Sequence, residues 1–281
     1  MRSDLHTCGG MMAVFGAFVT RSNDMTVTKR LVARLDIKGP NLIKGVQLEG
    51  LRVVGDPSVF ALNYFEQGID EIIYMDIVAS LYGRNSLTEI IRKTADEVFV
   101  PLTVGGGVRS VQDVRELLNA GADKVAINTA AIRRPQLLKE VSETLGAQCI
   151  VLSIEAKRVS GASWEVFTDN GRERTGYDII EWVTVASQTG IGEILLTSVD
   201  NEGTRRGLDL DLIKRVSSAV DVPVIASGGL GSPLHLVDAL SAGADAVATA
   251  DALHFNRHSI ADLRRAALSG GFTMRSLPLP Q

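Results

Sequence analysis

The sequence predicts an α/β fold, a (βα)8 TIM barrel built from two similar half-barrels. The first observation is an internal repeat, in which residues 100–123 (VPLTVGGGVRSVQDVRELLNAGAD) match residues 222–245 (VPVIASGGLGSPLHLVDALSAGAD). The second is the alternation of eight short apolar runs with amphipathic stretches. The third is length, because 281 residues suit a single barrel of about 250 residues plus a short extension.

The eight apolar runs are the predicted barrel strands. They are residues 31–37, 71–76, 100–104, 124–127, 149–155, 193–197, 223–226 and 246–249. Runs without polar alternation suit parallel strands that are buried on both faces. An open, doubly wound sheet is the alternative, but an even repeat of four units plus four favours a closed barrel.

Start and stop signals frame the helices between these strands. Ser110 can cap the helix VQDVRELLNA, and Gly121 ends it. Pro135 opens QLLKEVSETL, which Gly146 ends, while Asp209 and Pro233 open two further helices.

The first residues differ in character from the rest of the chain. Met25 is a second plausible start, so residues 1–24 are interpreted as a dispensable extension and residues 25–281 as the single barrel domain. A leader peptide is the alternative, because residues 11–19 form an apolar run behind Arg2. That run falls short of the ~18 residues needed to span a membrane.

Composition narrows the classes of function. The formal net charge is −4, which gives no electrostatic case for nucleic acid as a partner. The two cysteines, Cys8 and Cys149, are not a disulfide framework and suit a reducing cytoplasm. Neither cysteine stands at zinc spacing from a histidine, so no metal or cofactor site is expected.

Two carboxylates stand where the active site of such a barrel should lie. Catalytic groups of (βα)8 barrels cluster at the carboxyl ends of the strands. Asp36 ends the first predicted strand and Glu155 the fifth, at equivalent points of the two halves. They are therefore candidates for an acid/base pair in which one holds a proton while the other is ionised. The alternative is that each pairs with a nearby lysine, Lys38 or Lys157.

Glycine-rich strand ends predict two anion sites at the same mouth. Gly107 ends the run 105–107, and Gly228 and Gly229 end the equivalent run 227–229. Glycines let backbone N–H groups approach a phosphate, although they also serve tight turns. Asn128 and Thr129 follow the next strand of the first half.

The equivalent position in the second half carries an acid. Asp251 stands there, and Glu202 is a further acid nearby, with Arg205 and Arg206 expected to offset both. Since like charges repel, the first-half site should bind phosphate more tightly.

Charged residues also mark the starts of the strands, at the barrel floor. They are Arg30, Glu71, Lys124 and Glu193. A ring of opposite charges at this place either has a purely structural role or forms a polar gate.

Several segments together resemble one known family. From about residue 30 to residue 270 the chain resembles the cyclase subunit of imidazole glycerol phosphate synthase, an enzyme of histidine biosynthesis. The segments that carry the resemblance are LDIKGPNLIKG, DEIIYMDIVAS, TVGGGVRS, GADKVAINTAA, GEILLTSVDNEGT, IASGGLG and GADAVATADALHF. The isomerase of the same pathway shares the half-barrel repeat, but LDIKG and GADKVAINTAA favour the cyclase.

The resemblance implies a reaction and a partner. A glutaminase subunit would dock on the floor, at the N-terminal face of the barrel, and ammonia would pass through the barrel to the mouth. There it would convert a bisphosphorylated ribulosyl aminoimidazole carboxamide into imidazole glycerol phosphate and aminoimidazole carboxamide ribotide. The resemblance implies that Asp36 and Glu155 are catalytic and that Lys44 is the lysine of a flexible loop. It implies phosphate binding by Gly107, Asn128, Thr129, Gly203 and Gly229. The gate would consist of Arg30, Glu71, Lys124 and Glu193.

Departures from the family pattern gather at the mouth. Glu155 replaces an aspartate, Asp251 a serine and Glu202 an aspartate, whereas the gate residues match. Two other functions therefore stay open: a cyclase-like paralog that uses ammonia to amidate a surface-polysaccharide sugar, and a barrel that activates a glutaminase with little chemistry of its own.

Overall fold

The computed structural model describes residues 27–77 and 87–277. The predicted extension, residues 1–24, lies outside the described residues. Within the described ranges, no helix is long and apolar enough to cross a membrane.

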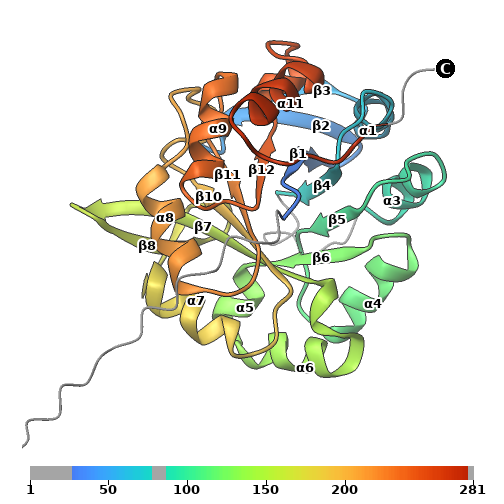
Figure 1. The fold of residues 1–281 in the computed structure, drawn as a ribbon. Helices are drawn as coiled ribbons and strands as arrows, with labels where there is room; N and C mark the ends of the chain where they lie inside the picture. The colour runs from blue at the N-terminus through green and yellow to red at the C-terminus, as the bar shows by residue number, and fades with distance from the viewer. Residues whose placement is uncertain (1–26, 78–86, 278–281) are drawn as a thin grey trace, which may run out of the picture.

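The structure is a closed barrel of eight parallel strands, as the sequence predicts. The barrel strands follow one another in the order β1, β4, β5, β6, β7, β10, β11 and β12, and β12 pairs with β1 to close the ring. Figure 1 shows the helices arranged around these strands. The strands are β1 (Arg30–Lys38), β4 (Glu71–Asp76), β5 (Leu102–Gly105), β6 (Lys124–Ile127), β7 (Ile150–Ser160), β10 (Glu193–Ser198), β11 (Val224–Ser227) and β12 (Ala246–Thr249).

The helices begin and end close to the sequence signals. Ser110 accepts a hydrogen bond from the backbone N–H of Asp113, whose side chain bonds back to the Ser110 N–H, so a capping box starts α4. The described helices are α1 (Pro57–Glu66), α3 (Thr88–Ala95), α4 (Val111–Asn119), α5 (Thr129–Arg133), α6 (Gln136–Leu145), α7 (Ile179–Ser187), α8 (Leu210–Ala219), α9 (Pro233–Ser241), α10 (Asp251–His254) and α11 (Ile260–Ser269).

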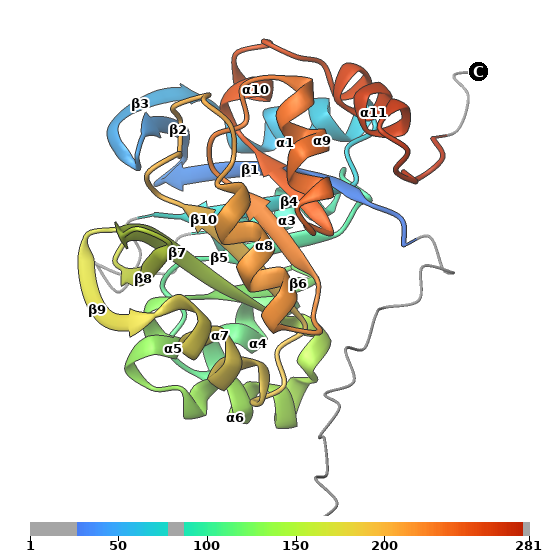
Figure 2. The same cartoon turned by 60° about the vertical axis from the view of Figure 1, so that its left-hand side comes forward.

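Two antiparallel hairpins extend the barrel strands, and the sequence reading missed both. β2 (Asn41–Val46) and β3 (Glu49–Gly55) follow β1, and β8 (Ser163–Thr168) and β9 (Glu173–Asp178) follow β7. They were missed because β3 and β9 are largely exposed, and β9 is polar as well, whereas the prediction relied on buried apolar runs. Figure 2 shows both hairpins at the same end of the barrel, where β1 and β7 end.

The interior divides into two apolar layers. A large cluster joins the outward faces of the strands to the helices. A smaller cluster takes alternate strand residues, such as Val32, Ile73, Val151, Leu195 and Ile225, and contains no helix residue. Because side chains alternate along a strand, this second cluster is the inside of the barrel. On β1 the same alternation places Arg30, Arg34 and Asp36 inside as well.

Candidate active site

Asp36 is buried at the end of β1 and is held by an arginine on its own strand. The Nε of Arg34 donates to Oδ1 of Asp36 at 2.9 Å, and both side chains are almost fully buried. Burial alone would raise the pKa of Asp36, but the charges of Arg34 and Lys44 outweigh it and hold that pKa below its ordinary value. Asp36 is therefore ionised at neutral pH.

Glu155 occupies the equivalent place on β7, but its pKa is shifted in the opposite direction. Its Oε2 accepts one hydrogen bond, 2.8 Å long, from the backbone N–H of Gly171 in the turn after β8. Burial raises the pKa of Glu155 to about 7, and the bond from Gly171 and the charge of Arg34 offset burial only in part. At neutral pH Glu155 is thus close to half protonated, so the two carboxylates differ in proton occupancy.

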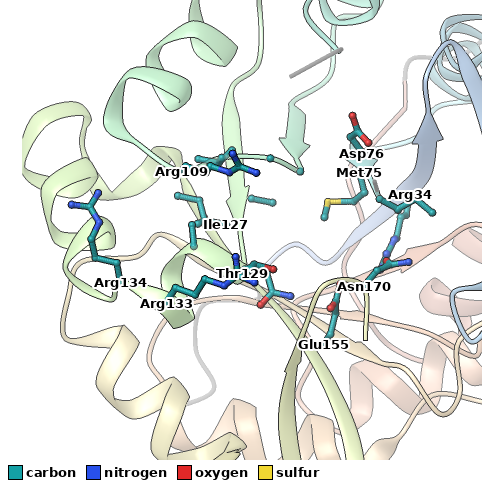
Figure 3. Close-up of a pocket in the computed structure, with 17 residues that line it drawn as sticks. Arg34, Met75, Asp76, Arg109, Ile127, Thr129, Arg133, Arg134, Glu155 and Asn170 are labelled. Atoms are coloured by element: carbon teal, nitrogen blue, oxygen red, sulfur yellow. The ribbon is translucent and has the colours of Figure 1, made fainter. Parts of the chain in front are cut away.

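The larger pocket of the mouth opens beside Glu155. It holds about 240 Å³ and is lined from both sides by polar groups, including the predicted residues Gly107, Asn128 and Thr129. Figure 3 shows Arg109, Arg133 and Arg134 on one side of this pocket and Arg34 on the other, next to Glu155 and Asn170. These arginines suit an anionic ligand, which would compete with the carboxylates that already pair with Arg133 and Arg134, namely Asp169 and Glu140.

Two buried polar atoms of described residues at this pocket lack a hydrogen-bond partner. Within the described residues, Oδ1 of Asn128 and Nδ2 of Asn170 have no hydrogen-bond partner. Such atoms are costly unless a ligand or water satisfies them. A ligand with both donors and acceptors would recover that cost.

The equivalent pocket of the second half is much smaller. It holds about 10 Å³ and is lined by the residues expected to bind the second phosphate, Gly203, Gly228, Gly229 and Asp251. That is roughly the space of one water molecule, so a phosphate needs a rearrangement to enter. The two half-sites, similar in sequence, are therefore unequal in volume.

The acids of the smaller pocket are neutralised, but by residues other than those expected. Nζ of Lys44 contacts Oε1 of Glu202 in a buried ion pair, and Nε of Arg257 lies 2.7 Å from Oδ1 of Asp251. Arg205 and Arg206, which the sequence suggested for this role, are exposed. The resemblance places Lys44 in a flexible loop; here it lies in β2, buried against Glu202, because β2 pairs with β1.

Backbone crowding explains why both strand-end turns contain glycine. At Gly106 (φ +109°) a Cβ would lie 2.3 Å from the carbonyl oxygen of Asp76, and at Gly229 (φ +104°) it would lie 2.1 Å from that of Gly207. Any other residue would displace the backbone at these points. The turns are thus required by the fold, whether or not they also bind phosphate.

The four charged residues at the floor form a closed ring. Arg30 contacts Glu71 at 2.6 Å and also Glu193, while Lys124 lies 2.8 Å from each of the same two carboxylates. Each cation thus bridges both anions. A hollow of about 310 Å³ lies on this face, lined in part by Arg30, Lys124 and Glu193.

Sequence reasoning missed Arg34 and Asn170. Arg34 stands two residues before Asp36, so strand alternation already placed it on the same face. Asn170 lies in the turn between β8 and β9, where both Asp169 (φ 51°) and Asn170 (φ 62°) adopt left-handed backbone. That hairpin was not foreseen, so its residues could not be assigned to the mouth.

Asp36 itself does not line either pocket. Among the described residues that form the two pocket walls, Arg34 belongs to both and Asp36 to neither. Across the described ranges, no group of three or more His, Cys, Asp or Glu side chains is arranged to hold a metal ion.

This chain is similar to one known protein family and to several known proteins. The model of the histidine biosynthesis protein family matches residues 30–259. The imidazole glycerol phosphate synthase subunit HisF of Legionella pneumophila is 64% identical over 202 residues, 72% of this chain and 95% of that protein. The HisF subunit of Mycobacteroides abscessus is 49% identical over 257 residues, 89% of this chain and all of that protein. That of Corynebacterium diphtheriae is 47% identical over 258 residues, 90% of this chain and all of that protein.

Proposed function

Because this chain belongs to the histidine biosynthesis protein family, as a cyclase subunit of imidazole glycerol phosphate synthase, we propose that its mouth performs the ammonia-dependent cyclase reaction. The substrate is a bisphosphorylated ribulosyl aminoimidazole carboxamide. The products are imidazole glycerol phosphate and aminoimidazole carboxamide ribotide.

The opposite pKa shifts of Asp36 and Glu155 carry this proposal. A reaction that adds ammonia and then closes a ring needs one group to accept a proton and another to donate one. Asp36, with its lowered pKa, is the base, and Glu155, with a pKa of about 7, is the acid. Glu155 lines the larger pocket directly, whereas Asp36 is joined to it through Arg34.

Ammonia is proposed to enter through the floor and move up the barrel axis. The ring of Arg30, Glu71, Lys124 and Glu193 would gate this route, and the hollow beside it would face a docked glutaminase subunit. The apolar interior above the ring suits neutral ammonia better than ammonium, because an ion would lose its hydration there.

Substrate binding is proposed to begin at the larger pocket. Gly107, Asn128 and Thr129 would take one phosphate, with Arg109, Arg133 and Arg134 adding positive charge. Gly203, Gly228, Gly229 and Asp251 would meet the second phosphate after the smaller pocket widens. Lys44 would release Glu202 as the hairpin of β2 and β3 adjusts. We place the protein in the cytoplasm, since its low cysteine usage suits a reducing compartment.

The narrow second pocket favours one other candidate function. A pocket of about 10 Å³ beside two carboxylates suits a substrate that has no phosphate at that end. A cyclase-like paralog that uses ammonia to amidate a surface-polysaccharide sugar would have such a substrate, and it would keep the same ammonia route and acid/base pair.

Turnover by the isolated chain distinguishes these functions. The purified protein is supplied with the bisphosphorylated substrate and ammonium chloride, and imidazole glycerol phosphate is measured. Formation of both products supports the cyclase function. No product with the bisphosphate, in a folded protein that is stabilised by a glutaminase partner, would favour the paralog or the non-catalytic activator.

A further inference from the structure

Arg34 is a buried cation on the barrel axis that the roles above leave without a function. Its side chain is 3% exposed. It faces the barrel interior between Val32, a member of the inner apolar cluster, and Asp36 at the mouth. Placing a guanidinium there is costly, so more than one interaction must compensate for it.

Three acceptors from three strands fix the guanidinium. Its Nε donates to Asp36 on β1, and its Nη1 donates to Oγ1 of Thr197 on β10 at 2.9 Å and to Oγ of Ser227 on β11 at 3.4 Å. Because the group is planar and rigid, fixing two nitrogens also fixes the direction of the third. Nη2 donates to no other described residue, since the hydrogen bonds of this side chain come from Nε and Nη1.

Arg34 lies at both pockets of the mouth. Arg34 is the residue shared by the walls of the larger and the smaller pocket, so it stands between the two half-sites. Figure 3 shows its side chain reaching toward Glu155 and Asn170, across the pocket from Arg133 and Thr129. A ligand that spans both half-sites must pass the guanidinium at its middle.

Neutralising Asp36 does not by itself account for this arrangement. A lysine could supply a charge to Asp36, whereas a guanidinium held through Nε and Nη1 keeps Nη2 as a further, preorganised donor on a side chain that lines both pockets. Preorganised donors of this kind stabilise an oxygen on which negative charge develops.

We propose that Arg34 is a catalytic residue whose Nη2 donates a hydrogen bond to the carbonyl oxygen of the substrate carbon that ammonia attacks. This inference rests on the proposed function, whose ribulosyl substrate carries one ketone. The lone pair of ammonia forms the new C–N bond while the C=O π pair moves to the oxygen beside Arg34. That oxygen then takes a proton from Glu155. The nitrogen loses a proton to Asp36 through one water molecule, because Asp36 lines neither pocket, and a neutral carbinolamine remains.

The test separates this role from ordinary binding. Arg34→Lys keeps a positive charge beside Asp36 but removes the fixed Nη2 donor. With saturating ammonium chloride and the bisphosphorylated substrate, kcat is expected to fall about 10²- to 10³-fold while KM changes less than about threefold. Circular dichroism verifies that the variant is folded.

A matched control comes from another buried arginine. Arg264 contacts Asp70 and the carbonyl oxygen of Gly68, away from both pockets. Arg264→Lys should lower thermal stability but leave kcat within about twofold. Arg34→Ala should regain at least about tenfold of its lost kcat when guanidinium is added well below denaturing concentrations, and sodium chloride should give no such recovery.

Two results would overturn the role of Arg34 while leaving the cyclase function intact. One is an Arg34→Lys variant with kcat within about threefold of the parent chain. The other is a raised KM with unchanged kcat, which is the mark of ground-state binding alone. If the parent chain itself gives no turnover, the proposed function fails and the role of Arg34 in it fails as well.

Discussion

Asp36 and Glu155 stand at equivalent ends of β1 and β7, yet their surroundings shift the two pKa values in opposite directions. Arg34 contacts Asp36 directly at 2.9 Å, whereas the hydrogen bond of Glu155 comes from the neutral backbone of Gly171. A repeated sequence has thus produced an asymmetric pair, and that asymmetry leads to the first two predictions.

Asp36→Asn should abolish ammonia-dependent turnover, because an amide cannot accept the proton that the carboxylate takes. The loss is expected to be at least about 10²-fold in kcat. Substrate affinity should be nearly unchanged, and the measurement is steady-state turnover with ammonium chloride. Asp262→Asn, at an exposed carboxylate of α11, is the control. Near-normal turnover in Asp36→Asn would refute the assignment.

The pH dependence should report the proton on Glu155. If the protonated form is the acid, kcat falls as the pH rises through about 7, where this carboxyl ionises. The raised pKa also means that the folded protein binds this proton more tightly than the unfolded chain does. Stability therefore decreases from about pH 4.5 to about pH 7 through this group, and Glu155→Gln should remove that decrease.

Paired measurements verify this prediction. Chemical unfolding of the parent chain and of Glu155→Gln, at several values of pH, gives the difference in unfolding free energy. A difference that does not change between pH 4.5 and pH 7 would mean that Glu155 titrates normally.

Asp251→Ser should strengthen the binding of a bisphosphate ligand about three- to tenfold, since one like charge leaves the smaller pocket. Arg257, released from Asp251, would add to the gain. The gain should grow at low salt, where screening is weakest. Isothermal titration at two salt concentrations measures it, with Asp262→Ser as the control. Equal affinity in the parent chain and Asp251→Ser would show that this side chain does not act on the ligand.

Lys124→Met should impair the transfer of ammonia from the floor ring to the mouth. The change leaves Glu71 and Glu193 with Arg30 as their shared cation, which should cost roughly 1–3 kcal/mol of stability. Turnover with added ammonium chloride should stay near that of the parent chain. With a glutaminase partner, fewer products should form per glutamine hydrolysed. An unchanged ratio would argue against a gate, and Lys139→Met, at an exposed lysine of α6, is the control.

Much of the fold could be predicted because the repeat and the strand ends are local features of the sequence. The eight buried runs appear as barrel strands, and Ser110 begins α4 as expected. The hairpins were missed because a polar, exposed strand such as β9 lacks the apolar run on which the prediction relied.

The contacts of the site could be predicted where a residue's position on a strand alone determines them. Arg30 and Lys124 meet Glu71 and Glu193 because all four start barrel strands. By contrast, Thr197 and Ser227, the partners of Arg34, lie far away along the chain, so no local pattern could reveal that contact.

The volume of the smaller pocket also escaped prediction for a physical reason. Glu202 and Asp251 line this pocket, and their ion-pair partners are Lys44 of β2 and Arg257 after α10, which the sequence did not identify. The glycine turns predicted a site in each half and Asp251 predicted weaker phosphate binding in the second, but neither predicted the volume of the pocket.

Conversion of the bisphosphorylated ribulosyl aminoimidazole carboxamide by this mouth, with ammonia as co-substrate, can be measured in one assay. The isolated chain is mixed with that substrate and ammonium chloride, and the two products are separated and quantified over time. Our account predicts equal amounts of imidazole glycerol phosphate and aminoimidazole carboxamide ribotide, and none from the folded Asp36→Asn variant. A folded parent chain that binds the substrate but yields neither product would contradict it.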